Sequence, residues 1–384
     1  MKILQLHNSY LQGGGEDVLL DAQVASLREV GEDVTVVRVK NPSKFVEQVK
    51  TFALSPWNPA SARTLAKLID EVRPDVAHVH NTWYRWSPSI VGTLRNHGVP
   101  VVMTVHNYRL MCPNAIFYRD GAPCTDCLGT HPWRGVLHRC YRDSAAQSFV
   151  AAGTLSLNRA MGTWERGIDR YVVSTEFLRD LLERAGFPGD RIRVARPTIP
   201  DVGIRTRPPS QSNQVVFAGR LEEEKGLESV LESWRRVNPD LELLIVGDGP
   251  MRETLTDMNV PGVRFLGWQP HERLTEILLG ARALVFPSDW FETLGLSLVE
   301  GLSAGLPILA IDVGTRREVV GGDGAGFLVP LDAPHRWDAA IEQVADDAAV
   351  DAASTAARAR YEQFYAPQVT VPPLVEVYRE LAEG

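Results

Sequence analysis

The sequence predicts an α/β protein with two doubly wound parallel sheets. Short runs rich in β-branched residues alternate with segments of helical spacing along nearly the whole chain. A Pro-rich stretch of low hydrophobicity, residues 205–213, interrupts that alternation near the middle. The chain has 384 residues, more than one hydrophobic core usually holds, so two domains are expected.

Five apolar runs in the first half predict strands that are buried on both faces, as parallel strands are. They cover residues 1–6, 33–39, 76–80, 99–105 and 170–174. Segments with helical spacing separate them, for example residues 17–30 and 61–72, and residues 191–195 are expected to close the sheet.

Strand-like runs resume after the Pro-rich stretch, at residues 215–218, 242–246, 263–266, 283–287 and 308–312. We therefore expect an N-terminal domain at 1–200 with a Cys-rich insertion at 107–142, a linker at 201–213, a C-terminal domain at 214–365 and a final helical segment at 366–384. Right-handed crossovers place the loops at the carboxyl ends of the strands, and a cleft between two such domains should hold the ligand.

Composition excludes several classes of function. A net charge of −8 argues against nucleic-acid binding, which needs a basic face. No apolar run approaches the roughly 20 residues of a membrane-spanning helix, and the first residues lack the features of a signal peptide. We expect a cytoplasmic protein.

Two carboxylates stand on either side of a glycine in residues 288–301, directly after the expected strand at 283–287. Gly295 can open a helix, with Glu292 in the loop before it and Glu300 roughly two turns along its axis at about 1.5 Å per residue. One carboxylate can then reach a ribose and the other a sugar, which is typical of a nucleotide-sugar site. The alternative is a solvated carboxylate before an ordinary helix.

The start of this helix is also a candidate phosphate site. The backbone N–H groups of Thr293, Leu294 and Gly295 should lie unpaired there, because the first N–H groups of a helix have no partner within it. Such a helix end attracts phosphate.

Two cationic residues follow the expected strand at 215–218. Gly219 ends the strand, and Arg220 and Lys225 lie five positions apart, so both can bind a diphosphate. Together they could neutralise a leaving diphosphate without a bound metal. The alternative is a solvated basic pair beside the acidic run 222–224.

Further loops of the second half are candidate nucleotide contacts. Gly247 and Gly249 follow the strand at 242–246 and would let a ligand approach closely, although tight turns use the same pattern. Leu266, within residues 265–268, is expected to wall the base, although core packing is the common fate of such residues.

The first half offers a glycine-rich loop at residues 12–17, where Gly14 and Gly15 allow backbone approach to a phosphate or sugar. It is not a dinucleotide fingerprint, because the third glycine and the acidic residue after the second strand are missing, so a nicotinamide cofactor is disfavoured. His106 follows the strand ending at residue 105, where ligands bind, although a lone histidine is more often structural. His78 and His80 should share one face and act mainly in packing or behind the site.

These segments, in their order along the chain, resemble the retaining glycosyltransferases of family 4, which have the two-domain GT-B fold of Rossmann-like domains. The segments are the glycine-rich first loop, residues 74–80 and 104–107, Gly219–Arg220 with Lys225–Gly226, residues 246–250, and the Glu292–Glu300 pair. The resemblance spans nearly the whole chain. One departure is Arg196–Ile199, where many relatives carry Asn-Gly, so nothing is carried over at that hinge.

The resemblance implies a role for each matching residue. Arg220 and Lys225 would hold the donor diphosphate, Glu300 the ribose and Glu292 the donor sugar. His106 would lie by the reacting centre, and Gly14 and Gly15 near the donor phosphates and the acceptor. The last helix would cross back to the N-terminal domain.

All four cysteines of the chain fall in the insertion after His106. They are Cys112, Cys124, Cys127 and Cys140. A Cys-x-x-Cys centre with one cysteine on each side fits a tetrahedral structural zinc site, in which His131 or His138 could replace one thiolate. The alternatives are unbound thiols, or a disulfide formed only on purification.

The resulting hypothesis is a retaining transferase without a catalytic cofactor. It would move a hexose from a nucleoside-diphosphate sugar to a hydroxyl of a glycan, a lipid-linked sugar or a secondary metabolite. A lipid-linked acceptor would bring it into peripheral contact with the inner face of the membrane. The alternatives are a sugar-nucleotide epimerase of GT-B fold and a non-catalytic sugar-nucleotide-binding subunit; retention of all four charged residues, Arg220, Lys225, Glu292 and Glu300, speaks against the latter.

Overall fold

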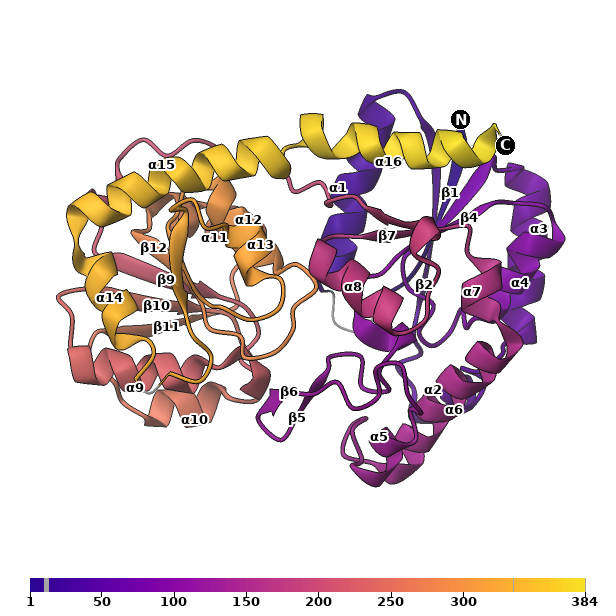
Figure 1. Ribbon diagram of the computed structural model, residues 1–384, viewed down its shortest axis with the longest axis horizontal. Helices are drawn as coiled ribbons and strands as arrows, with labels where there is room; N and C mark the ends of the chain where they lie inside the picture. Colours follow the sequence, from indigo (N-terminus) through magenta and orange to yellow (C-terminus); the bar gives the residue numbers. More distant parts are fainter. Residues whose placement is uncertain (10–13, 334, 384) are drawn as a thin grey trace. The chain divides into compact units, whose positions relative to one another are not determined.

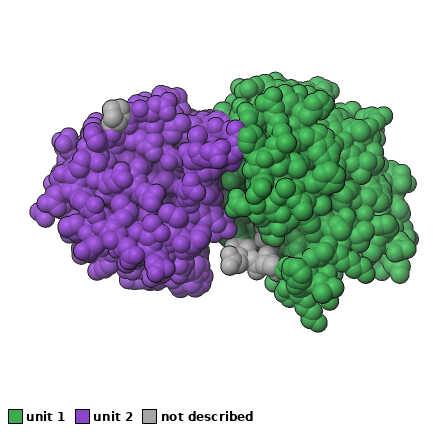
Figure 2. Space-filling view, turned by 90° about the horizontal axis from the view of Figure 1, so that it is seen from below, with its two compact units in different colours: residues 1–117, 125–198, 370–384 green, residues 118–124, 199–369 purple. Residues whose placement is uncertain are grey.

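The computed structural model describes residues 1–9, 14–333 and 335–383 and divides into two compact units (Figures 1 and 2). Unit 1 contains residues 1–117, 125–198 and 370–384, and unit 2 contains residues 118–124 and 199–369. Each unit is built on a six-stranded sheet whose neighbouring strands pair in parallel. The predicted fold class is confirmed.

The sheet of unit 1 has the order β2-β1-β3-β4-β7-β8. Its strands are β1 (Lys2–Ser9), β2 (Asp33–Lys40), β3 (Val76–Val79), β4 (Val101–Thr104), β7 (Arg170–Val173) and β8 (Ile192–Val194). Its helices are α1 (Gly15–Glu29), α2 (Phe45–Ala53), α3 (Pro59–Val72), α4 (Ser89–Asn96), α5 (Arg134–Leu137), α6 (Ala145–Met161), α7 (Thr163–Gly167), α8 (Glu176–Arg184) and most of α16 (Pro367–Ala382). The strand order reverses between β1 and β3.

The C-terminal helix α16 completes the core of unit 1. Leu374, Val375 and Tyr378 of this helix are buried in one cluster with Ile3 of β1 and Leu20 of α1. Each fully buried aliphatic side chain of this kind contributes about 1.5–3 kcal/mol. The last helix therefore belongs to the N-terminal fold although it is the most distant part of the chain.

The sheet of unit 2 has the order β11-β10-β9-β12-β13-β14, which reverses between β9 and β12. Its strands are β9 (Gln214–Ala218), β10 (Glu242–Val246), β11 (Val263–Gly267), β12 (Ala283–Phe286), β13 (Ile308–Ile311) and β14 (Gly326–Val329). Its helices are α9 (Leu227–Val237), α10 (Arg252–Asp257), α11 (His271–Gly280), α12 (Leu296–Ser303), α13 (Arg316–Val320), α14 (Asp338–Ala345) and α15 (Asp347–Phe364).

Several expectations about single elements need correction. The strand expected from residue 99 begins at Val101, after Pro100, which has no N–H to donate. Neither β14 nor the hairpin of β5 (Tyr118–Arg119) and β6 (Ala122–Pro123), which groups with unit 2, was predicted. Such short runs carry too few residues for a periodic pattern.

Side chains tie the expected linker at 201–213 to unit 2. Ser210 Oγ donates to Asp351 at 2.7 Å, and the Arg282 guanidinium donates to the carbonyl of Ser210 at 3.1 Å. Arg358 forms an ion pair with Asp201 at 2.6 Å.

Within the described part of the chain, no helix combines the length and the apolar composition that crossing a bilayer requires.

Candidate functional site

In unit 2, the predicted charged residues gather at the carboxyl ends of β9 and β12, where the strand order reverses. Gly219 and Arg220 follow β9, Lys225 ends a short 3₁₀ turn, and Glu292 lies in the loop after β12. Open α/β sheets bind ligands at such a reversal point. The topology therefore places these residues where a ligand site is expected.

Lys225 and Glu292 form a largely buried ion pair, with side chains 19% and 11% exposed. Lys225 Nζ lies 2.6 Å from Glu292 Oε1, and Ser288 Oγ donates to the same oxygen at 3.3 Å. Burial alone would raise the pKa of Glu292, but the charges of Lys225 and Arg316, together with these hydrogen bonds, lower it. Glu292 is therefore an anion held between two cations.

The second cation, Arg316, is fully buried at the start of α13. Its guanidinium donates to the carbonyl oxygens of Ser288 at 2.9 Å and Val313 at 3.2 Å, so it fixes the loop that carries Glu292. Arg316 was not predicted from the sequence. No local signal distinguishes it from the neighbouring Arg317, which is largely exposed.

Arg220 behaves differently from Lys225. Its side chain is 66% exposed and pairs with Glu222 at 2.9 Å. An exposed ion pair of this kind contributes little stability, so the guanidinium can change partner at low cost. The alternative interpretation, a solvated base beside the acidic run, thus describes Arg220 but not Lys225.

Glu300 lies on α12 and is buried, which raises its pKa to about 7. The helix begins at Leu296, after Gly295 with φ +85°, and this is later than the sequence predicted. Glu300 is therefore just over one turn into the helix rather than two. Thr293 and Leu294 precede the helix instead of opening it.

Gly247 and Gly249 are required by the packing of two loops. A Cβ on Gly247, where φ is +137°, would lie 1.8 Å from the carbonyl oxygen of Gly219, and one on Gly249 would lie 2.4 Å from that of Leu221. Backbone bonds join the same loops, with Gly219 N donating to Val246 O at 3.0 Å. The sequence predicted these glycines for ligand approach, and loop packing supplies a further reason for them.

Leu266 and Trp268 are not core residues. Leu266 is half-buried at the end of β11, and Trp268 is largely exposed. The common fate of such side chains, burial in the core, therefore does not apply to either of them.

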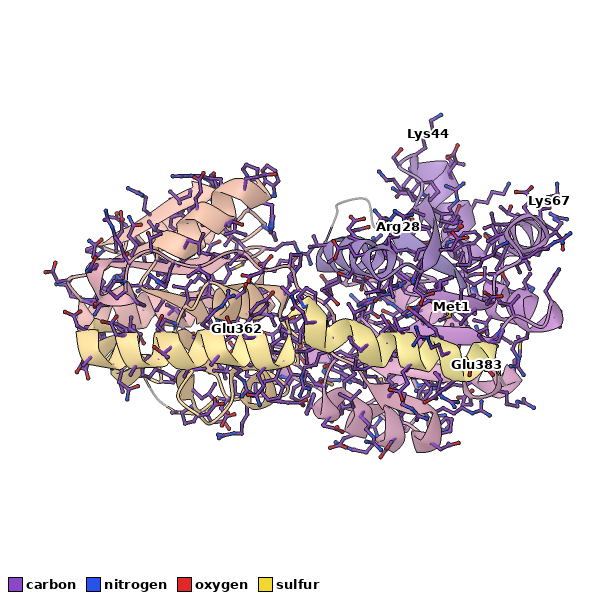
Figure 3. All side chains as sticks on the ribbon, turned by 90° about the horizontal axis from the view of Figure 1, so that it is seen from above. Met1, Arg28, Lys44, Lys67, Glu362 and Glu383 are labelled. Carbon is purple, nitrogen blue, oxygen red and sulfur yellow. The ribbon has the colours of Figure 1, made fainter. Side chains whose placement is uncertain are left out.

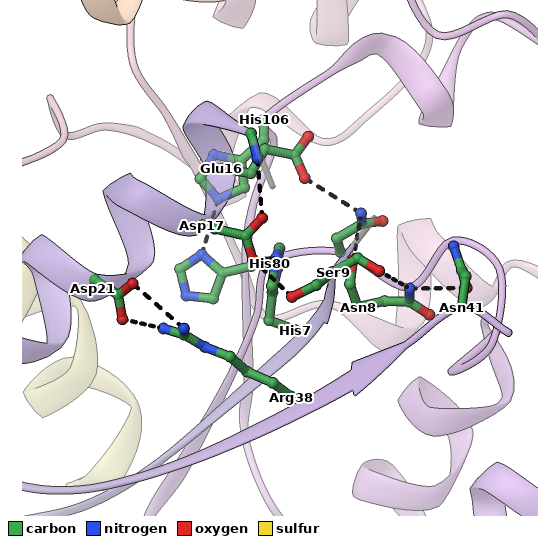
Figure 4. A network of polar contacts seen from close by, with 12 residues as sticks. His7, Asn8, Ser9, Glu16, Asp17, Asp21, Arg38, Asn41, His80 and His106 are labelled. Carbon is green, nitrogen blue, oxygen red and sulfur yellow. Dashed lines mark hydrogen bonds and ion pairs between the residues drawn. The ribbon is translucent and has the colours of Figure 1, made fainter. Parts of the chain in front are cut away.

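In unit 1, three histidines from neighbouring strand ends lie together (Figure 4). His80 Nδ1 is 2.9 Å from His106 Nε2, and the His7 ring packs edge-on to His80. Burial is the main cause that lowers the pKa of His106 to about 3 and that of His80 well below its usual value. These rings are therefore neutral at pH 7. His106 is not the lone histidine that the sequence suggested.

Glu16 is a partly buried carboxylate that was not predicted from the sequence. Its Oε1 accepts from Asn107 Nδ2 at 2.8 Å and its Oε2 from Asn81 Nδ2 at 3.3 Å. Burial raises its pKa to about 7 despite these hydrogen bonds. The signal that could have found it is its place on the first turn of α1, directly behind Gly14 and Gly15. Of the predicted loop, residues 12 and 13 lie outside the described residues.

His106 also lines a pocket within unit 1. The walls include His80, Asn107 and Arg109, together with the apolar side chains of Trp83, Leu155 and Trp164. This pocket lies at the carboxyl ends of β3 and β4, which is where the topology places a ligand site.

The zinc site predicted from the cysteines is not supported. The predicted ligands were Cys112, Cys124, Cys127 and Cys140. Among the residues that the structure describes, no group of three or more His, Cys, Asp or Glu side chains is arranged to hold a metal ion. None of the four cysteines forms a disulfide.

Comparison with known proteins extends these observations. Residues 13–198 match the family model "Glycosyl transferase 4-like domain", and residues 204–362 match "Glycosyl transferases group 1". The 2-deoxystreptamine N-acetyl-D-glucosaminyltransferase of Streptomyces fradiae is 28% identical over 376 residues, which cover 92% of this chain and 82% of the relative. The phosphatidyl-myo-inositol mannosyltransferase of Mycolicibacterium smegmatis is 25% identical over 381 residues, which cover 93% and 87%.

Solved structures share the fold. A sucrose-phosphate synthase from Thermosynechococcus elongatus superimposes with a TM-score of 0.74 at 17% identity and covers 99% of this chain and 98% of its own. Anabaena HepE, solved with UDP and glucose, gives a TM-score of 0.71 at 15% identity, with coverage of 99% and 100%. At such identities the likeness concerns the fold alone.

Proposed function

Because the chain belongs to the group 1 glycosyl transferases and has the GT-B fold, we propose that this transferase moves a hexose from a nucleoside-diphosphate sugar to an acceptor hydroxyl with retention of configuration. The observation that carries the proposal is the largely buried Lys225–Glu292 pair in the loops after β9 and β12, with Glu300 on the helix that follows β12. A protein that only binds partners has no need for this set of charges.

Breaking the bond between the anomeric carbon and the phosphate oxygen develops positive charge on the sugar and negative charge on the diphosphate. Lys225 and Arg220 neutralise the departing diphosphate, and the exposed Arg220 is the group that exchanges Glu222 for phosphate. Glu292 orients the donor sugar, and Glu300 accepts hydrogen bonds from the ribose. The protein's own cations supply the charge, so these steps invoke no cofactor.

The acceptor hydroxyl attacks the anomeric carbon on the face from which the diphosphate departs. The new carbon–oxygen bond forms as the old one breaks, and a phosphate oxygen takes the hydroxyl proton. This route retains the configuration. The two glutamates are not a glycosidase pair, because that role needs both carboxyl groups at one glycosidic bond.

The remaining predicted residues are proposed contacts of the nucleotide, the sugar or the acceptor. His106 would lie by the reacting sugar, and Gly14 and Gly15 beside the phosphates and the acceptor. The nucleotide contacts would be Gly219, Gly247, Gly249, Leu266, Thr293, Leu294 and Gly295.

Among acceptors, a lipid-linked one is supported by helix α2. None of its residues is buried, and Phe45 and Val46 are 78% and 77% exposed beside Lys44 and Lys50. Lys44 projects away from the body of unit 1 (Figure 3). Exposed apolar side chains between lysines suit a surface of anionic lipids, and one relative is named for a phosphatidyl-inositol acceptor. A peripheral position at a membrane follows from this proposal.

The test is calorimetric titration with UDP, GDP, ADP and dTDP, followed by an acceptor screen with the matching sugar nucleotide. One nucleotide should bind tightly, and sugar transfer should require the acceptor. Free nucleotide formed without any acceptor would favour the epimerase, and binding without turnover would favour the non-catalytic subunit. Glu292→Gln should keep nucleotide binding and lose transfer.

A further inference from the structure

A hydrogen-bonded path connects the C-terminal helix to His106 through the interior of unit 1. Gln5 Nε2 donates to the hydroxyl of Tyr378 at 3.3 Å, and Gln5 Oε1 lies 2.6 Å from His80 Nε2. On its other side, His80 Nδ1 lies 2.9 Å from His106 Nε2. Gln5, His80 and Tyr378 are buried, so water does not compete for these bonds.

The direction of each bond fixes where the protons are. Gln5 Oε1 can only accept, so His80 carries its proton on Nε2. A neutral His80 then has a lone pair on Nδ1, and this nitrogen must accept from His106. His106 therefore carries its proton on Nε2, and its Nδ1 is an acceptor.

We propose that Gln5 and His80 are positioning residues that hold the neutral His106 ring in the Nε2–H tautomer. Any group that bonds to Nδ1 must then donate. If the proposed transfer is correct, on which this consequence rests, His106 accepts a hydrogen bond from a sugar hydroxyl and does not protonate the leaving phosphate.

Neighbouring contacts orient Gln5 in the required way. The Tyr378 hydroxyl lies 2.6 Å from His78 Nδ1. Besides the hydrogen bond from Gln5, it accepts a second one from the side-chain amide of Gln23 at 3.3 Å. With its one proton directed to His78, Tyr378 accepts from both amides, so the amide group of Gln5 turns its nitrogen toward helix α16. The oxygen of Gln5 is thereby left for His80.

The test is ¹⁵N NMR of histidine-labelled protein without substrate at pH 7.5, with the His106 signals assigned by their loss in His106→Gln. The wild-type protein should show a protonated Nε2 and an unprotonated Nδ1. His80→Phe and Gln5→Met should convert this to a mixture or to the opposite tautomer. Gln5→Glu should restore the wild-type pattern, because a carboxylate still accepts from His80.

Gln23→Ala is the matched control, because Gln23 contacts Tyr378 and His78 but neither His80 nor His106. It should leave the His106 signals unchanged. A wild-type Nδ1–H tautomer, or an unchanged tautomer in both folded His80→Phe and Gln5→Met, would overturn the proposal. If His80→Phe fails to fold, Gln5→Met decides alone.

Activity provides a second readout. Gln5→Met should lower kcat about tenfold, which corresponds to one misplaced hydrogen bond, without changing nucleotide affinity. Unchanged kcat would contradict the catalytic consequence. Because the tautomer is read without substrate, absence of any transferase activity would count against the proposed function and not against this assignment.

Discussion

Lys225 Nζ lies 2.6 Å from Glu292 Oε1, so one ion pair joins the loop after β9 to the loop after β12. Both side chains are largely buried. Removing one partner of such a pair leaves a charge without compensation, which is costly, whereas the pair itself adds little net stability. The bond therefore makes the geometry of the two loops interdependent.

Lys225→Met should destabilise the protein by about 3–5 kcal/mol, because the Glu292 carboxylate stays buried without its main counter-charge. The pKa of Glu292 should rise, and nucleotide affinity should fall. Chemical denaturation and calorimetry at pH 7 measure both effects. Arg220→Met is the matched control, since its exposed pair with Glu222 is worth at most about 1 kcal/mol. Equal destabilisation by the two variants would contradict this account of the pair.

Glu300→Gln should stabilise the protein at pH 8. Burial raises the pKa of Glu300 from 4.5 to about 7, so the folded state binds this proton more tightly than the unfolded state does. The contribution of Glu300 to stability is thus greatest below pH 4.5 and is lost as the pH rises to about 7. Relative to wild type, the free energy of unfolding of the variant should be higher by up to about 3 kcal/mol at pH 8 and by much less at pH 5. Denaturant titrations at both pH values measure the difference in free energy of unfolding between the variant and wild type. A difference that is the same at pH 5 and pH 8 would refute this prediction.

The same carboxylate should make nucleotide binding depend on pH. If Glu300 binds the ribose as an anion, binding below pH 7 must displace the proton of Glu300. The dissociation constant of the nucleotide should therefore rise by up to about tenfold for each unit that the pH falls below 7. Calorimetry between pH 6 and 8 measures this slope. Glu224 lies in the same unit, and its pKa is also raised to about 7, by burial and by its hydrogen bond with Glu222. The slope must therefore vanish in Glu300→Gln; a slope that persists there belongs to another group.

The sequence could predict what depends on local pattern. Buried runs of β-branched residues give the strands of both six-stranded sheets except β14, and the spacing of Glu292 and Glu300 identifies the loop and helix after β12. Contacts between distant segments left no such signal. The burial of Arg316 against Ser288, for example, is decided by packing across the sheet.

The cysteines show the opposite error, in which a sequence pattern predicts a site that the structure does not support. Their spacing fits a zinc site, yet among the described residues no group of three or more His, Cys, Asp or Glu side chains is arranged to hold a metal ion. Spacing along a loop-rich segment does not determine proximity in space. Glu16 was overlooked because its partners, Asn81 and Asn107, come from two other strand ends.

Gly247→Ala should destabilise unit 2 by about 2–5 kcal/mol, from a strained backbone at φ +137° and from a Cβ placed 1.8 Å from Gly219 O. Because the loop after β9 must move, nucleotide affinity should fall as well. Thermal unfolding and calorimetry provide the measurements. Gly280→Ala is the control, since nothing lies within 4 Å of its Cβ, and it should be neutral or stabilising by up to about 1 kcal/mol. A stable Gly247→Ala variant would mean that the two loops can separate without cost.

Helix α2 should bind anionic bilayers through Phe45 and Val46 with Lys44 and Lys50 beside them. In vesicle co-sedimentation, wild type should bind vesicles that contain phosphatidylglycerol and bind phosphatidylcholine vesicles weakly. Changing each lysine to glutamine should weaken binding about fivefold, which corresponds to about 1 kcal/mol per charge at the surface. Phe45→Ser with Val46→Ser should weaken binding to both kinds of vesicle.

Leu137→Ser provides the control for α2, because Leu137 of α5 is 82% exposed and lies on another helix. It should bind vesicles as wild type does. Equal losses in this variant and in the α2 variants would indicate nonspecific adhesion of apolar surface. No binding of the wild type would remove the support for a lipid-linked acceptor and leave the nucleotide-sugar site unaffected, because α2 contributes none of the residues proposed there.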